Sequence, residues 1–154
     1  MPKRELEHQA PSMGDLLKWS VDHKIIGWQY TITALIFFII GGALAMGIRW
    51  ELLTPALDFM ASGDAYNSLF TIHGTVMIFL FVIPMFAGFG NYIVPLQLGA
   101  KDMAFPWLNA FAFWLIPPAG IMLLLGYVIG QANAGWTAYP PLSTIYGPDG
   151  QTLW

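Results

Sequence analysis

Residues 65–100 read A-Y-N-S-L-F-T-I-H-G-T-V-M-I-F-L-F-V-I-P-M-F-A-G-F-G-N-Y-I-V-P-L-Q-L-G-A, and they contain no Asp, Glu, Lys or Arg. The hydrocarbon core of a bilayer is about 30 Å thick, and about 20 apolar residues cross it as a helix. This stretch is therefore long enough to cross a membrane and to project beyond one face. His73 lies near its start. Because ionisable residues inside a membrane are costly and rare, His73 becomes a functional-site hypothesis.

The composition is that of a membrane protein. The 154 residues are 56% hydrophobic and 10% charged, whereas a soluble domain is about 25% charged. The net charge is −3 and no basic block is present, so nucleic acid is not expected as a partner. The sequence has no cysteine, which excludes disulfides, thiolate metal sites and thiol chemistry within it.

The apolar runs predict an all-α integral membrane fold with three transmembrane helices, and the lipid bilayer as their surroundings. The first helix is expected at about residues 25–48, between Lys24 and Arg49. The second is expected at about 67–95 and the third at about 107–130, since each run is long enough to cross the apolar core.

Proline and charge set the expected limits of these helices. Pro84 predicts a kink in the second helix, and Pro95 predicts that it ends near residues 91–95. Residues 49–67, which contain four charged residues together with Pro55 and Gly63, are expected to be a loop.

The two ends of the sequence are expected to lie outside the apolar core. Residues 1–24 form a polar lead without the features of a signal peptide, and residues 12–22 could form a short amphipathic helix. Residues 131–154 are expected to form an ordered, aromatic loop at a membrane interface. Five of the six basic residues fall on one side of the three-helix topology, so the positive-inside rule puts the N-terminus in the cytoplasm or its equivalent. These five are Lys3, Arg4, Lys18, Lys24 and Lys101.

His73 has two interpretations. A neutral imidazole in a membrane helix is a suitable ligand for haem iron, and the adjacent Gly74 would leave room for a macrocycle. Alternatively, His73 is a core histidine that hydrogen-bonds to another helix, because polar side chains commonly hold membrane helices together.

Asp102 also has two interpretations. With Asn91 before it and Asn109 after it, the carboxylate could hold a chain of water molecules that conducts protons into the membrane. Alternatively, Asp102 caps the third helix, for which Pro106 is a suitable first-turn residue.

A third group of residues lies near the opposite end of the predicted helices. Arg49 could donate hydrogen bonds to a cofactor carbonyl or carboxylate, or it could reach to the interface and pair with an acidic neighbour. Tyr66, Trp136 and Tyr139 could border the same cofactor or belong to an interfacial aromatic belt. Four methionines are expected to be core fillers: Met46, Met77, Met85 and Met122.

Several segments, taken together, resemble subunit I of the haem–copper oxidases. The segment D-H-K-I-I-G at 22–27 resembles the family's lead into its first helix, and R-W-E at 49–51 resembles the R-x-E that follows that helix. The segment at 66–79 is similar to the one that carries a ligand of the low-spin haem. Residues 88–109 resemble the mouth of a proton pathway, and G-W-T-A-Y-P-P-L at 135–142 resembles a loop over the haem propionates.

The resemblance implies roles for the residues around the haem. His73 would be an axial ligand of the low-spin haem iron, and Arg49 would donate to the formyl group of that haem. Tyr66 and Trp136 would lie on the propionate side. We expect the haem to be haem A.

The resemblance also implies a proton pathway. Asp102 would be the carboxylate at its mouth, and Asn91 and Asn109 would organise water behind it. The sequence departs from many members of the family at Ala110, where they have a second asparagine.

The implied activity is that of a proton-pumping cytochrome c oxidase, which passes electrons from cytochrome c to dioxygen. Subunit I of the family has about twelve transmembrane helices, so the three predicted here, in a domain at 25–154 that follows the 1–24 lead, would need the remaining helices. Those helices would hold the high-spin haem and copper, and subunits II and III would be partners. The expected location is a bacterial cytoplasmic membrane, with the mitochondrial inner membrane as the alternative.

Two other functions stay open. Quinol-oxidising relatives carry a His and a Gln where this sequence has Ala65 and Ser68, which favours cytochrome c, but a quinol oxidase is the alternative within the superfamily. A non-catalytic membrane subunit, in which His73 and Asp102 only hold helices together, is the alternative from another class.

Overall fold

The computed structural model describes residues 12, 14–55, 60–130 and 132–146, and every regular element within them is a helix. A single 3-10 turn, η1 (Asp15–Leu17), precedes α1 (His23–Glu51). A long middle rod follows, built from α2 (Gly63–Thr75), the π-helical η2 (Val76–Val82) and α3 (Ile83–Leu98). The last helix is α4 (Pro106–Gly130).

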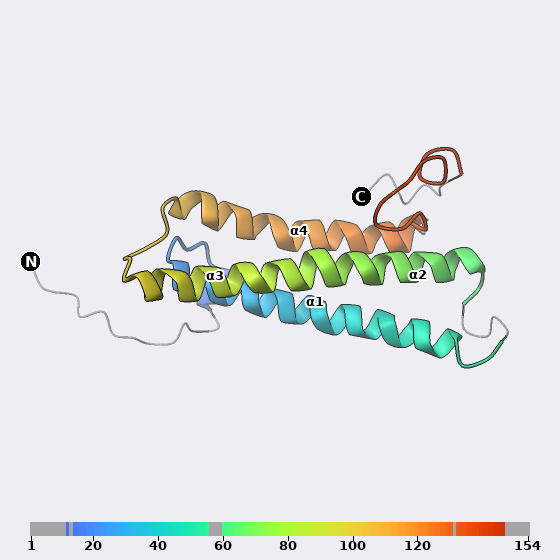
Figure 1. Cartoon of the computed structure of the whole chain (residues 1–154), viewed down its shortest axis with the longest axis horizontal. Coiled ribbons are helices and arrows are strands. Elements are labelled where there is room, and N and C mark those ends of the chain that lie inside the picture. The colour runs from blue at the N-terminus through green and yellow to red at the C-terminus, as the bar shows by residue number, and fades with distance from the viewer. Residues whose placement is uncertain (1–11, 13, 56–59, 131, 147–154) are drawn as a thin grey trace, which may run out of the picture.

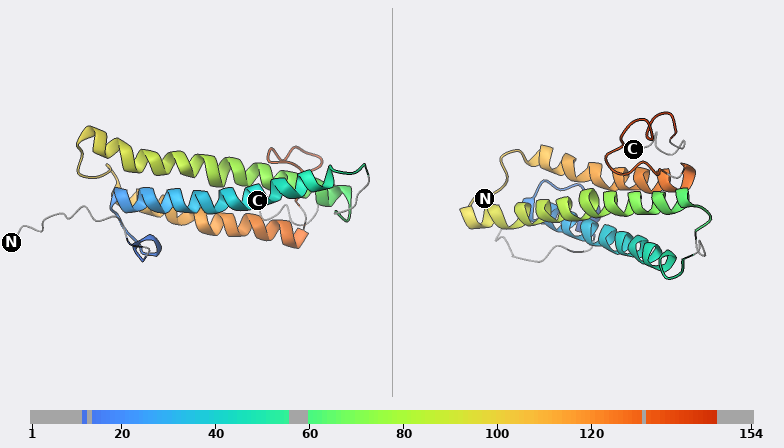
Figure 2. Two further views of the ribbon diagram at one scale, coloured as in Figure 1. Left: turned by 90° about the horizontal axis from the view of Figure 1, so that it is seen from below. Right: turned by 45° about the vertical axis from the view of Figure 1, so that its right-hand side comes forward.

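These elements form three antiparallel rods that lie side by side (Figure 1). Figure 2 shows from two further directions that α1 and α4 both run along the middle rod. All three rods are long and apolar enough to cross a membrane. The predicted all-helical fold with three transmembrane helices is therefore confirmed.

The first helix is longer at both ends than its apolar run. It begins at His23, where the Asp22 carboxylate accepts a hydrogen bond from the Lys24 amide at 2.8 Å, a typical N-cap. It continues through Arg49 to Glu51, so the predicted range of 25–48 and the predicted loop at 49–67 were wrong at these ends. Polar residues can extend a membrane helix beyond the bilayer, and hydropathy alone does not detect this extension.

The middle rod does not end near residues 91–95 as predicted, but continues to Leu98. Gly99 has a φ of 64°, and its amide donates to Leu96 while the Ala100 amide donates to Pro95 at 2.9 Å. These two bonds form the Schellman motif that closes many helices. The rod departs from α-helical geometry in the π-helical η2, which comes directly before Ile83 and Pro84.

Two clusters of buried side chains hold the rods together. Ile26 and Tyr30 of α1 pack with Ala110 and Phe113 of α4 in one half of the bundle. Phe37 packs with three residues of the middle rod in the other half, and its ring fills the space beside Gly120 of α4. The backbones of α1 and α3 approach closely at Gly27 and Gly88, where a Cβ atom on Gly27 would lie 3.1 Å from the Gly88 carbonyl oxygen.

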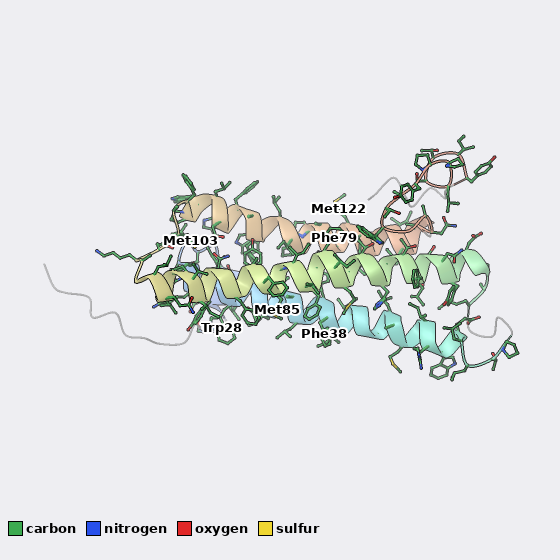
Figure 3. The ribbon with its side chains drawn as sticks, viewed as in Figure 1. Trp28, Phe38, Phe79, Met85, Met103 and Met122 are labelled. Atoms are coloured by element: carbon green, nitrogen blue, oxygen red, sulfur yellow. The ribbon has the colours of Figure 1, made fainter. Side chains whose placement is uncertain are left out.

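Two local expectations need correction. Residues 12–22 do not form an amphipathic helix, since the described part contains only η1, in which Leu17 is exposed. Hydrogen bonds from the hydroxyl and the amide of Ser12 lower the pKa of Asp15 in this turn. Met46 and Met122 are not core fillers in this chain, because both are more than half exposed. Figure 3 shows Met122 on the outer side of α4.

The polar residues of interest are divided between the two ends of the bundle. The turn between α3 and α4 lies at the same end as η1, and the connection between α1 and α2 lies at the other end with the segment 132–146 (Figure 1). The predicted orientation in the membrane depends on this placement of successive connections at opposite ends of the bundle.

Candidate functional site: two polar centres at opposite ends of the bundle

His73 lies on α2 and faces α1. Its Nδ1 atom is 2.9 Å from the carbonyl oxygen of Gly41. Since a carbonyl oxygen only accepts, Nδ1 must donate, and the proton on this nitrogen leaves the lone pair of Nε2 available. The side chain is partly buried. A fixed tautomer of this kind is what a metal-binding histidine needs, because a hydrogen bond at one ring nitrogen orients the other.

The space around His73 is suited to a flat group. A Cβ atom built on the adjacent Gly74 would meet no atom within 4 Å, and the same is true of Gly42 on α1. Gly41 differs, because a Cβ atom there would lie 2.5 Å from the Met77 sulfur. Within the described residues, no three His, Cys, Asp or Glu side chains come together to hold a metal ion. The residues present could therefore supply one axial ligand, His73, to a flat group in the open space beside it.

Tyr66 shares a face of α2 with His73. The two residues are seven positions apart in an uninterrupted α-helix, so they lie about two turns, or ~10 Å, from each other on one side. Arg49 lies in the last turn of α1, where a cation also stabilises the helix terminus. Its side chain is exposed. The structure thus brings Tyr66 and Arg49 to the same end of the bundle as His73, without a direct contact among the three.

Trp136 is held on another side of α2. The Gly135 amide donates to the Thr71 hydroxyl at 3.2 Å, and the Trp136 ring contacts that of Phe79 at 6.1 Å between centroids. Thr71 precedes His73 by two residues, which turns it about 200° around the helix. The structure therefore does not bring Trp136 to the face that His73 and Tyr66 share.

The second centre lies at the other end, where α3 and α4 meet. The Asn109 side-chain amide donates to the Asn91 side-chain carbonyl, and the Asn91 amide donates to the Ala87 carbonyl at 2.9 Å. Asn91 is buried. Asn109 also lines a pocket of about 250 Å³ that includes Met103 and Leu108, and Figure 3 shows Met103 at this end. The predicted pair of asparagines is thus a bonded pair that joins two helices.

Asp102 lies in the turn that connects these helices. Its carboxylate accepts a hydrogen bond from the Met103 amide at 2.7 Å, and the side chain is partly buried. Because α4 begins at Pro106, Asp102 is too early to be its N-cap, and the capping interpretation is wrong. In the part of the chain that the structure describes, no hydrogen bond joins Asp102 directly to either asparagine.

His23 is a residue of this centre for which we predicted no role. It is 3% exposed, and its Nδ1 atom lies 2.9 Å from the backbone carbonyl oxygen of Asn91. Gln29, also on α1, donates to the carbonyls of Leu16 and Lys18 and so attaches the preceding segment to the helix. Pro95 is the sequence signal that could have indicated a role for His23. It lies four residues after Asn91 and has no backbone N–H, so the Asn91 carbonyl needs a donor from elsewhere.

The fold and the two centres define a class of protein. Three apolar helices carry an oriented imidazole beside open space at one end and a bonded carboxamide pair near a carboxylate at the other. Ionisable and polar groups at such depths commonly serve cofactors or ion pathways in membrane proteins. The class is therefore a multi-pass membrane protein with a candidate cofactor site.

Comparison with known proteins identifies the family. Residues 25–154 match the family described as "Cytochrome C and Quinol oxidase polypeptide I". The chain belongs to this family of membrane helical bundles, which confirms the resemblance predicted from the motifs.

Named relatives agree with this assignment. The chain is similar to cytochrome c oxidase subunit 1 of Thermostichus vulcanus, with 55% identity over 141 residues that make up 91% of this chain and 25% of the relative. It is 50% identical to the subunit of Synechocystis sp. over 147 residues, which is 96% of this chain and 26% of that protein. The protein of the same name from Corynebacterium efficiens is 47% identical over 143 residues, 90% of this chain and 24% of the relative. The chain thus spans about a quarter of these relatives.

Proposed function

We propose that these helices belong to the catalytic subunit of a terminal respiratory oxidase, which accepts electrons from cytochrome c and reduces dioxygen to water while pumping protons. The proposal extends to the whole protein, since this chain covers only about a quarter of the length of its relatives. The observation that carries it is the open space beside Gly74, next to an imidazole whose Nδ1 atom is bonded to Gly41 and whose Nε2 lone pair is therefore available.

His73 would be an axial ligand of a low-spin haem. The free Nε2 atom and the open space beside Gly74 support this role. When bound, the haem would supply one-electron redox chemistry, and we propose that it is haem A. The contribution of the protein is to fix the ring orientation of the ligand through Gly41, which keeps the imidazole in the tautomer that iron requires.

Three further residues would tune this group. Arg49, in the last turn of α1, would donate to the formyl group. Tyr66, on the His73 face, would donate to a propionate, and Trp136, held against Phe79 on another side of α2, would make a smaller contribution on the propionate side. Hydrogen bonds and charge at the edge of a haem are among the means by which proteins set its reduction potential.

Asp102, Asn91 and Asn109 would form the mouth of a proton pathway. The carboxylate lies in the α3–α4 turn, partly buried, and the two amides are bonded to each other behind it. A carboxylate at this position can exchange protons with water, and carboxamides can orient water molecules without titrating themselves.

The proposal includes the surroundings of the chain. The high-spin haem and copper would be held by the remaining helices of subunit I, and subunits II and III would complete the complex. The N-terminus and the Asp102 turn would face the cytoplasm, a side supported by the distribution of Lys and Arg. Bacterial relatives support a bacterial membrane as the location.

The proposed activity is tested on the purified oxidase complex from the organism that carries this sequence. We expect rapid dioxygen consumption with reduced cytochrome c and little with a quinol. Dioxygen consumption with quinol alone would replace the cytochrome c assignment by that of a quinol oxidase. A complex with neither activity and no haem absorption would indicate a structural subunit.

A further inference from the structure

His23, the first residue of α1, makes a contact that the proposed pathway does not use. It is one of the most buried polar side chains of the described chain, at 3% exposure. Its Nδ1 atom lies 2.9 Å from the Asn91 carbonyl oxygen, between residues 68 positions apart in the sequence. A buried carbonyl without a donor is costly, so this contact has structural weight.

The Asn91 carbonyl lacks its usual α-helical donor. In an α-helix this oxygen would accept from the amide of the residue four positions later, and that residue is Pro95, which lies inside α3. Proline has no backbone N–H, and its ring also crowds the carbonyl four residues before it. The His23 ring occupies the position of the missing donor.

The same residue, Asn91, carries the side chain that bonds to Asn109. Its amide is held by Ala87 on α3, and its side-chain carbonyl accepts from Asn109 on α4. The backbone of Asn91 is therefore fixed by α1 while its side chain reaches α4. The position of the amide pair depends on both connections.

We propose that His23 is a positioning residue. Its ring donates to the Asn91 carbonyl in place of the N–H that Pro95 lacks, and it thereby fixes the hydrogen bond between the Asn91 and Asn109 side chains. The effect on proton uptake rests on the proposed function of these two asparagines. The structural role of His23 does not depend on that function, because it is inferred only from its hydrogen bond to Asn91 and from the position of Pro95.

The test is a double-mutant cycle in the complete oxidase complex. His23→Leu removes the donor and keeps a side chain of similar bulk. Pro95→Ala restores an amide at position 95, so that α3 can satisfy the Asn91 carbonyl without help from α1. We expect His23→Leu to slow proton uptake by about tenfold, the factor for one buried hydrogen bond. In the Pro95→Ala background the same change should slow uptake less than threefold, because the donor is no longer needed.

Two further variants separate positioning from a general packing defect. His23→Gln keeps an N–H donor, and we expect uptake within about threefold of the wild type. Pro84→Ala changes the other proline of this rod, which has no relation to Asn91, and it should not rescue His23→Leu. The low-spin haem band, which reports on the opposite end of the bundle, should be unchanged in all variants.

A stability measurement keeps the two proposals apart. The midpoint of thermal unfolding of the same variants gives the coupling between positions 23 and 95 without any assay of proton transfer. If Pro95→Ala restores the thermal stability lost in His23→Leu, the contact of His23 with Asn91 is supported. If Asn91→Ala also takes up protons normally, the asparagines do not belong to the pathway, and only the proposed function fails. Equal losses from His23→Leu in both backgrounds, or no loss in either, would overturn the positioning role.

Discussion

The Nδ1 atom of His73 and the carbonyl oxygen of Gly41 lie 2.9 Å apart, and this hydrogen bond links the middle rod to α1 in the half of the bundle away from the α3–α4 turn. Gly41 has two functions here, because its carbonyl orients the imidazole and its missing side chain leaves room for Met77. A change that moves either helix therefore rotates the ring of the proposed haem ligand.

Substitution of Gly41 by alanine tests this arrangement. The new Cβ atom would lie 2.5 Å from the Met77 sulfur and 3.3 Å from a methyl group of the buried Val76. We expect a loss of about 1–3 kcal/mol in stability from overpacking, together with a displaced low-spin haem band. Gly90→Ala is the control, since a Cβ atom there meets nothing within 4 Å and Gly90 lies on α3, away from the open space beside His73. Equal behaviour of the two variants in thermal melts and absorption spectra would contradict the close packing at Gly41.

Arg49→Lys tests the proposed contact with the formyl group. Lysine keeps the positive charge that is favourable in the last turn of α1, but it lacks the planar fork of donors. We expect the low-spin haem absorption to shift to shorter wavelength. Lys24→Arg, at the other end of the same helix, should leave the band unmoved. A band that stays in place in Arg49→Lys would remove the arginine from the haem.

Tyr66→Phe tests the proposed propionate contact. Loss of a donor to a carboxylate leaves more negative charge beside the iron, which favours the oxidised state and lowers the reduction potential. We expect a fall of about 40 mV, the one-electron equivalent of a hydrogen bond of about 1 kcal/mol. Redox titration of the low-spin haem measures it.

Trp136→Phe is the comparison for Tyr66→Phe. It keeps an aromatic ring against Phe79, and because Trp136 is held on another side of α2, we expect a smaller shift. A larger shift from the tryptophan than from the tyrosine would reverse their proposed contributions.

Asp102→Asn tests the pathway. The asparagine oxygen can still accept from the Met103 amide, so the turn should keep its structure while it loses its titrating group. We expect proton uptake and turnover to slow by about tenfold or more, with both haem signals intact. Asp64→Asn, at the opposite end of the bundle near Asn133, is the control. Normal uptake in Asp102→Asn would exclude this carboxylate.

Hydropathy predicted the three helices because each apolar run exceeds the thickness of a bilayer. It did not predict that α1 begins at His23, because a buried polar residue resembles a solvated one in sequence. Pro95 was interpreted as the end of its helix, yet α3 continues past it to Leu98, with the His23 ring against the Asn91 carbonyl and Gly99 closing the last turn. Such a tertiary contact is not visible in local sequence patterns.

Among the candidate residues, too, some placements could be predicted from the sequence and others depend on tertiary contacts. The pairing of Asn91 with Asn109 agrees with their expected place near one mouth of the bundle. The place of Trp136 depends on how the segment 132–146 folds back onto Thr71 and Phe79, and no periodicity in the sequence encodes that contact. The π-helical η2 was missed as well, because the apolar pattern of residues 76–82 does not separate a π-helix from an α-helix.

The most direct test is the absorption spectrum of the assembled complex that carries His73→Ala. Removal of the axial ligand should abolish the low-spin haem signal, while the high-spin haem, held by other helices, should keep its own. A normal low-spin spectrum in this variant would contradict iron ligation by His73.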